Sequence, residues 1–243
     1  QIMFLAELGA DPTDERVRRG CDYLLSHAIA KNGAFSMSQR PVPSSVVHCL
    51  NGDILDALLR LGYIADPRVQ VAIDWQARAI TNQGEIRYYK SGASGPNFGC
   101  AYNQGQPCAW GATKAMKALL AVPPEQRSPL VQRAIEAGVA FLLSRDPAVA
   151  DYPYTERVNT SWFKFGFPLS YRSDILETVS VLVSLGYGRD PRLANACQLI
   201  LSKQDGQGRW AMERTLNGKM WIDIEQKGQP SKWITLRALR VLK

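Results

Sequence analysis

The sequence predicts an all-helical protein built from repeated helical hairpins, and three features lead to this prediction. Four segments combine small, aromatic and aliphatic residues at helical spacing. A second helical pattern alternates with the first, and two of its copies end in the same Leu-Gly-Tyr, at 61–63 and 185–187. Equivalent positions lie 52, 62 and 62 residues apart, at Val17, Val69, Val131 and Leu193. Self-similarity at such a period is typical of repeat architectures.

The repeat divides the chain into four hairpins, which span residues 14–63, 66–122, 128–187 and 190–243. Three of their first helices begin with a proline (Pro67, Pro129 and Pro191), which is favoured at a helix start because its missing N–H costs nothing there. The opening residues 2–9 match the end of the second helical pattern. We therefore expect one domain over residues 1–243 that continues a longer chain at its N-terminus.

Residues 195–210 form the most specific stretch, because an apolar helical run is followed by a glycine turn and a tryptophan. Gly206 and Gly208 are residues with which a helix end enters a left-handed turn. We expect Gln204 to bond the backbone groups freed at this end and Trp210 to pack its ring over them. The stretch therefore predicts a helix with a locally locked C-terminus.

Gln204, Gly208 and Trp210 after this helix resemble the QW motif of the squalene cyclase and prenyltransferase family, the terpenoid cyclase-like proteins. The resemblance covers essentially the whole chain as four hairpins. It implies an α/α toroid, in which inner helices form a barrel inside a ring of outer helices. It also implies an isoprenoid or other apolar substrate in the barrel lumen, with prenyl transfer or cyclisation as the reaction. The motif itself stabilises the ring and carries no chemistry.

The long loops all connect the first helix of a hairpin to the second, so in a toroid they would crowd one mouth of the barrel. Aromatic rings stabilise carbocations through their faces, as the cyclisation chemistry of this family requires. The candidate substrate-binding residues are Trp110, Trp162, Phe165, Tyr171, Trp221 and Trp233. The alternative is that these rings only fill the core.

Carboxyl groups are the candidate acids. Class II terpenoid cyclases protonate an alkene with an Asp of a D-x-D-D motif, and neither this motif nor the Mg²⁺-binding D-D-x-x-D occurs here. Asp53 and Glu177 share a register one turn into two second-pattern helices, and Asp174 lies close by in sequence. A carboxylic acid kept protonated by apolar surroundings is what alkene protonation needs. The alternative is that each carboxylate is solvated or ion-paired in the barrel wall.

Three cysteines and a histidine suggest a metal site. Cys49 and Cys108 occupy the same register at the starts of two second-pattern helices, while Cys100 precedes Cys108 in a glycine-rich loop and His48 adjoins Cys49. Thiolate and neutral imidazole are the ligands that Zn²⁺ prefers, so zinc is the candidate cofactor. The alternative is that these are small core residues, since free cysteine is among the most buried residue types.

The charge and hydrophobic composition of the chain limit the kinds of partner that the protein can bind. The net charge is +7, but Lys and Arg are spread singly, which argues against a nucleic-acid partner and leaves peripheral contact with a membrane surface open. No apolar run is long enough for a transmembrane segment. Five cysteines without a secretory signal favour the cytoplasm.

Three functions stay open: an isoprenoid-handling enzyme, a non-catalytic toroid scaffold that binds a lipid or protein, and a zinc-thiolate protein.

Overall fold

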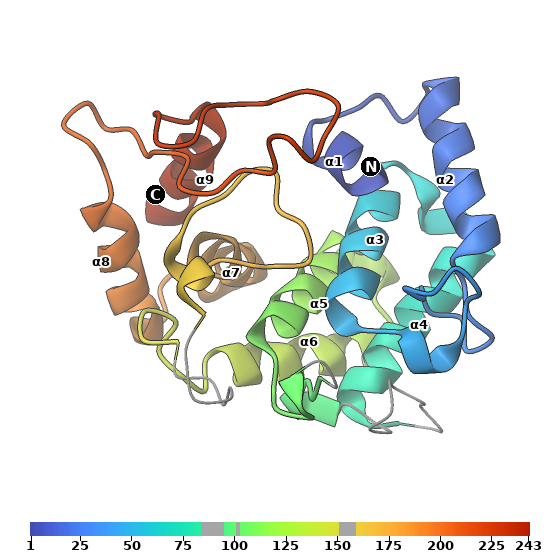
Figure 1. Ribbon diagram of the computed structural model, residues 1–243. Coiled ribbons are helices and arrows are strands. Elements are labelled where there is room, and N and C mark those ends of the chain that lie inside the picture. Colours follow the sequence, from blue (N-terminus) through green and yellow to red (C-terminus); the bar gives the residue numbers. More distant parts are fainter. Residues whose placement is uncertain (84–94, 101–102, 151–158) are drawn as a thin grey trace. The chain divides into compact units, whose positions relative to one another are not determined.

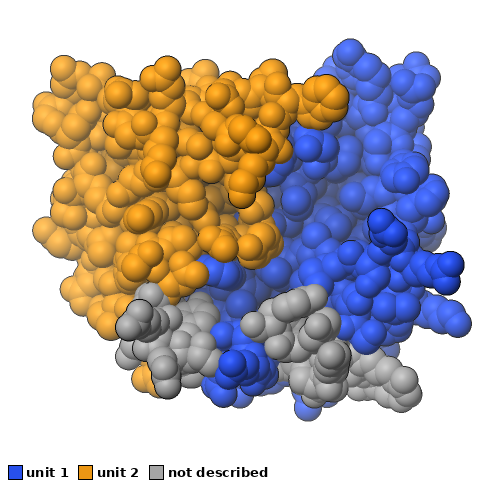
Figure 2. Space-filling view, viewed as in Figure 1, with its two compact units in different colours: residues 1–142, 153–155 blue, residues 143–152, 156–243 orange. Residues whose placement is uncertain are grey.

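The computed structural model confirms the all-helical prediction. It describes residues 1–83, 95–100, 103–150 and 159–243, and within these ranges it contains helices and isolated bridges but no strands. The chain divides into two compact units, which Figure 2 shows in different colours. Gln1–Leu142 form most of unit 1, and Glu156–Lys243 form most of unit 2. No helix in the described ranges is both long and apolar enough to cross a membrane.

The α-helices of unit 1 pack in two layers (Figure 1). Their bounds are α1 Ile2–Glu7, α2 Glu15–His27, α3 His48–Arg60, α4 Pro67–Thr81, α5 Ala109–Ala121 and α6 Pro129–Leu142. Helix α3 packs against α1 on one side and α5 on the other, and these three form the first layer. Helices α4 and α6 pack on each other and also contact α3 and α5, respectively, so they form the second. This layering follows the predicted alternation of two helix patterns.

Burial explains why the two patterns differ. Helix α2 buries only Val17, Cys21 and Leu25, a stripe at a spacing of four residues that is typical of a helix with one face in the core. Helix α3 is buried almost continuously from Asn51 to Leu58, including two aspartates. A helix enclosed on most sides must pair its polar groups with neighbours, and that requirement creates the polar clusters described below.

In unit 2, α7 (Ile175–Leu182) packs against both α8 (Ala194–Ser202) and α9 (Lys232–Leu242). Helix α7 continues in a wider turn over Val183–Tyr187, where Gly186 adopts a φ of 96°. Glycine adopts the left-handed conformation at little cost, which makes it the usual residue at such a helix end. This explains the Leu-Gly-Tyr ending; its first copy likewise places Gly62 at a φ of 84°.

Three helical segments start with the same aspartate cap, which the sequence analysis did not identify. Asp14, Asp66 and Asp190 each accept the backbone N–H of an arginine two residues later, and each carboxylate also pairs with that arginine's side chain. The cap satisfies a backbone donor that the first turn leaves unpaired. The repeat is therefore marked by an Asp-x-Arg unit at the start of its first-pattern helices.

Helices α3 and α5 approach each other at Gly52. A Cβ atom at this position would overlap the carbonyl group of Lys114 and lie 2.8 Å from the backbone nitrogen of Ala115. Backbone atoms inside a helix cannot move aside as a flexible side chain can. The absence of a side chain at Gly52 therefore sets the separation of the two helices.

Replacing Gly52 with alanine should push α3 and α5 apart. We expect Gly52→Ala to lower the free energy of unfolding by about 3 kcal/mol, near the upper end of the usual cost of overpacking a core. Urea denaturation followed by circular dichroism measures the change.

The matched control is Gly206→Ala, because no atom lies within 4 Å of the position of its Cβ. This variant should change the free energy of unfolding by less than about 0.5 kcal/mol, as surface substitutions usually do. Equal stability of the two variants would show that α3 and α5 do not approach as closely as described.

Candidate functional site

Asp174 is a buried carboxylate of unit 2, and only 1% of its surface is exposed. It lies at the N-cap of α7, where its Oδ1 accepts the backbone N–H of Glu177 at 2.8 Å. Its Oδ2 accepts the backbone N–H of Gly166 at 3.1 Å. One carboxyl group therefore both caps α7 and ties the segment around Gly166 to the start of that helix.

The surroundings of Asp174 favour its neutral form. Burial first, and then the nearby carboxylate of Glu177, raise the pKa of its carboxyl group to about 6. The N–H bond from Glu177 and the charges of Arg214 and Arg237 act in the opposite direction but are outweighed. With a pKa of about 6, roughly a tenth of the molecules carry a proton on Asp174 at pH 7. Perturbed carboxyl groups of this kind are typical of functional sites.

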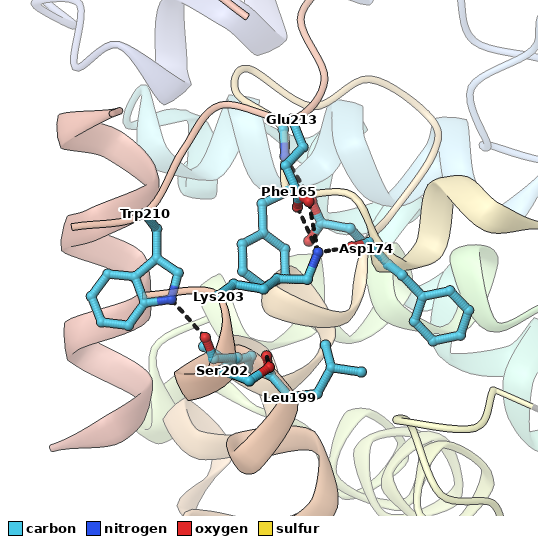
Figure 3. A network of polar contacts seen from close by, with 10 residues as sticks. Phe165, Asp174, Leu199, Ser202, Lys203, Trp210 and Glu213 are labelled. Atoms are coloured by element: carbon cyan, nitrogen blue, oxygen red, sulfur yellow. Dashed lines mark hydrogen bonds and ion pairs between the residues drawn. The ribbon is translucent and has the colours of Figure 1, made fainter. Parts of the chain in front are cut away.

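A second carboxylate, Glu213, holds the segment that contacts Asp174 (Figure 3). Its Oε2 accepts the backbone N–H of Phe165 at 2.8 Å, and its own N–H donates to the Phe165 carbonyl at 2.9 Å. The ammonium group of Lys203 donates to both oxygens of Glu213, at 2.7 and 2.9 Å, and to the carbonyl of Phe163 at 2.7 Å. Lys203 and Glu213 therefore fix the backbone immediately before Gly166.

Lys203 lies at the end of α8, where the QW-like stretch begins. The indole N–H of Trp210 donates to the carbonyl of Ile200 at 2.6 Å, and the Trp210 side chain is fully buried. The expected packing of this ring over the end of α8 is confirmed. The turn between them is held by Asp205, whose Oδ1 accepts the N–H groups of Gln207 and Arg209. Gln204 also takes part, since its backbone N–H donates to the Leu201 carbonyl at 3.0 Å and it forms an isolated bridge with Trp210. The sequence analysis does not identify the contribution of Asp205.

Aromatic rings surround this part of unit 2. Phe167 stacks on Trp233 with their centroids 4.5 Å apart, and the Arg237 guanidinium lies 5.0 Å from the centroid of Phe167. The Lys203 ammonium lies 4.8 Å from the centroid of Phe165. Among the described residues, the buried indole nitrogen of Trp233 has no hydrogen-bond partner. A buried polar atom without a partner requires an explanation, and a bound ligand or water is one.

The predicted aromatic residues divide into four groups. Phe165 and Trp233 lie in the neighbourhood of Asp174, as described above. Trp162 is buried elsewhere in unit 2 and donates its indole N–H to the Pro147 carbonyl at 2.9 Å. Tyr171 and Trp221 are surface residues, with 48% and 96% of their area exposed, and Trp110 belongs to unit 1. Phe167 belongs to the same aromatic stretch of the sequence, between Trp162 and Tyr171, and it stacks on Trp233.

Asp53 lies in unit 1 and has a different environment from Asp174. Its Oδ1 pairs with the ammonium group of Lys114 at 2.9 Å, and both side chains are buried. Lys117, one turn later on α5, pairs with Glu7 and with Asp56. Asp53 thus belongs to an ion-paired network between α1, α3 and α5, which favours the ion-paired interpretation of this residue over the acid. Glu177, the predicted partner of Asp53, belongs to unit 2.

The structure brings the three predicted cysteines together at the starts of α3 and α5. Cys108 caps α5, and its sulfur accepts the Gly111 N–H at 3.4 Å. The Cys100 thiol lies within hydrogen-bonding reach of Cys108 and, with burial, raises the pKa of that thiol well above its usual value. Burial and the charges of Asp53 and Cys100 raise the pKa of Cys49 to about 12. All three are therefore thiols, not thiolates, near neutral pH.

His48 faces a different set of neighbours. The Gln76 amide donates to its Nδ1 at 2.6 Å, and burial lowers the pKa of His48 to about 3, so the ring is neutral. Gln76 in turn accepts from Asn51, which accepts the Phe35 N–H. These bonds link the first turn of α3 to the C-terminal half of α4 and account for one ring nitrogen of His48. In the described part of the chain, no group of three or more His, Cys, Asp or Glu side chains is arranged to hold a metal ion.

The raised pKa of Asp174 predicts a pH-dependent stability. The group binds its proton more tightly in the folded state (pKa about 6) than in the unfolded state (3.8), so stability falls as pH rises through this interval. The change amounts to roughly 2.4 kcal/mol between pH 4 and 7, since one pKa unit corresponds to about 1.4 kcal/mol and the unfolded group is already partly ionised at pH 4. We expect Asp174→Asn, which can still cap α7, to lack this loss in urea denaturation at the two pH values.

Asp190→Asn is the control, because it alters another aspartate cap of unit 2. The Arg192 side chain lowers the pKa of Asp190 to about 2, so its contribution is lost only as pH falls below about 4. This variant should keep the wild-type loss between pH 4 and 7. If Asp174→Asn also keeps it, Asp174 does not have the raised pKa.

Comparison with known proteins gives no further identification. No protein-family model, curated protein or solved structure matches the chain. The likeness to the terpenoid cyclases therefore depends on the repeat and on Gln204, Gly208 and Trp210. The residues around Asp174 and around the three cysteines are therefore the basis for any proposed function.

Proposed function

We propose that the protein binds an isoprenoid or a similar apolar substrate and that Asp174 donates a proton to it. The observation that carries this proposal is the carboxyl group of Asp174, which is buried and has a pKa of about 6. A general acid works best when its pKa lies near the operating pH, since it is then both populated and able to transfer its proton. The reaction class is acid-initiated cyclisation or a related proton transfer to a carbon–carbon double bond.

The neighbours of Asp174 suit the charge that such a step creates. Protonation of a double bond leaves a carbocation, which the faces of aromatic rings stabilise. Phe165, Phe167 and Trp233 supply such rings in unit 2. The carboxylate that remains on Asp174 is stabilised by the N–H groups of Gly166 and Glu177. The carboxylate product of the proton transfer thus has its partners in place.

Prenyl transfer from a diphosphate is less well supported. The arginines near Asp174, Arg214 and Arg237, could neutralise an anionic group, but Asp174 and Glu177 lie in the same neighbourhood and oppose an anion. The zinc ion expected of a prenyl-transfer site also has no suitable group of ligands in the described ranges. Cyclisation is therefore our first choice. The cytoplasm stays the compartment we expect from the cysteine content.

A non-catalytic scaffold is the second candidate, and one observation favours it. Both oxygens of Asp174 already accept backbone N–H bonds, so the carboxyl group has a complete structural task as a helix cap. A toroid that kept this cap and lost its chemistry would bind a lipid or a protein without turnover. The two candidates differ in whether a proton from solvent reaches the bound molecule.

Solvent deuterium decides between these candidates. In D₂O the wild-type protein should convert an acyclic polyene such as squalene into a product that contains one additional deuterium. Asp174→Asn should lower the turnover at least 100-fold, which is the usual minimum contribution of a general acid. Gas chromatography with mass spectrometry measures both. The wild-type rate should also fall with rising pH above about 6, as Asp174 loses its proton.

The control is Asp190→Asn, which alters an exposed aspartate cap of the same unit and should keep the wild-type rate. Urea denaturation of each variant separates loss of activity from loss of the fold. Binding of the polyene without turnover or deuterium uptake in the wild type would favour the scaffold. Turnover by Asp174→Asn at the wild-type rate would remove Asp174 as the acid.

A further inference from the structure

The cysteines of unit 1 form a second cluster that the proposed acid does not use. Gly99 and Pro107 face each other in an isolated antiparallel bridge. The Cys100 N–H donates to the Gln106 carbonyl at 3.0 Å, and the Cys108 N–H donates to the Phe98 carbonyl at 3.1 Å. Cys100 and Cys108 each follow a bridge residue, so their side chains share one face of the bridge. Their thiols meet there, within hydrogen-bonding reach.

Gly111 brings the third cysteine close to this pair. The position that its Cβ would occupy lies 3.8 Å from the Cys108 sulfur and 3.8 Å from the Cys49 backbone nitrogen. The missing side chain thus lets the start of α3 approach the sulfur that caps α5. Cys49 is close enough for its charge to affect the pKa of Cys108, as is Cys100. The cluster consists of Cys49 at the start of α3, Cys108 at the start of α5 and Cys100 beside the bridge, and none of the three is in a disulfide.

The arrangement fits a pair of thiols in contact better than a zinc site. Zinc needs three or four donors disposed around one point, and no such group is found among the residues that the structure describes. His48 has one ring nitrogen engaged by Gln76. Two thiols in contact need only each other, because a disulfide forms between two sulfur atoms.

We propose that Cys100 and Cys108 are an oxidation site, at which a small disulfide oxidant closes an intramolecular disulfide, with Cys49 as a third thiol able to exchange into it. The residues Cys100 and Cys108 are buried, with 8% and 9% of their surface exposed, so a small oxidant reaches them more readily than a protein does. Closure would fasten the bridge segment to the start of α5. This inference does not depend on the proposed acid chemistry of unit 2.

The chemistry balances with oxidised glutathione as the oxidant. The thiolate of one cysteine attacks the glutathione disulfide, forms a mixed disulfide and releases one glutathione thiolate, which takes up the proton. The thiolate of the other cysteine then attacks the protein sulfur of the mixed disulfide and releases the second glutathione. The two cysteines lose two electrons and two protons, and the oxidant becomes two glutathione thiols.

The rate of oxidation should rise with pH, because only the thiolate attacks. Burial and the Cys100 thiol raise the pKa of Cys108. The Asp53 carboxylate raises the pKa of Cys49, the Lys114 ammonium opposes it, and the adjoining His48 ring is neutral. We expect an increase of about tenfold per pH unit between pH 7 and 9.

Peptide mapping tests the proposal directly. Cys100 and Cys108 lie in one tryptic peptide, residues 91–114, because no Lys or Arg separates them. After oxidised glutathione is added to the reduced chain, this peptide should lose two hydrogen atoms in mass and resist iodoacetamide at both cysteines. Dithiothreitol should restore two labels. Cys49→Ala should keep this behaviour, and Cys108→Ser should abolish it and leave glutathione on Cys100.

Cys21→Ala and Cys197→Ala are the controls, because these cysteines belong to α2 and α8 and should not affect the disulfide. Three results would overturn the proposal. The first is labelling of both cysteines after oxidation, and the second is a mixed glutathione disulfide that persists in the wild type. The third is one equivalent of zinc, measured by elemental analysis, that protects all three thiols from iodoacetamide.

Discussion

A carboxylate buried between helices must be compensated, and both units are arranged around this requirement. In unit 1 the compensation is an ion pair, in which the Asp53 carboxylate meets the ammonium group of Lys114 at 2.9 Å inside the helix pair. In unit 2 Asp174 has two backbone N–H groups and the fields of two arginines, and these do not offset its burial. The remaining cost appears as a raised pKa. A protein-bound proton near neutral pH is therefore a consequence of how unit 2 is packed.

The repeat makes the contrast between the units informative. Lys114 lies six residues after the N-cap of α5, Cys108, and Arg237 lies six residues after the N-cap of α9, Ser231. Both helices thus carry a cation at the same position. The Arg237 guanidinium lies over the ring of Phe167, and its effect on the pKa of Asp174 is smaller than that of burial. The cation at this position thus forms an ion pair with Asp53 in unit 1, whereas in unit 2 it lowers the pKa of Asp174 without outweighing burial.

The sequence predicted the helices well, because periodic burial, glycine ends and proline starts are local signals. It also predicted that Cys49, Cys100 and Cys108 lie together, since register along a repeat determines which helix starts coincide. The sequence did not predict contacts in which the partner side chain comes from another segment of the chain. Three contacts depend on packing that no local pattern contains: the ion pair of Asp53 with Lys114, the ion pair of Lys203 with Glu213, and the stacking of Trp233 on Phe167. The toroid stays a prediction, since each unit is described by itself.

The chemistry that we propose lies, in both units, at the N-terminal ends of second-pattern helices. Free backbone N–H groups there stabilise negative charge, whether on a carboxylate or on a thiolate. Cys108 and Asp174 use these groups in the same way, since each accepts the N–H three residues later, from Gly111 and Glu177. The residue type at this one position then decides the chemistry, because a thiol gives up electrons to an oxidant and a carboxyl group gives up a proton. A single repeated scaffold can therefore support two unrelated reactions without a change of backbone.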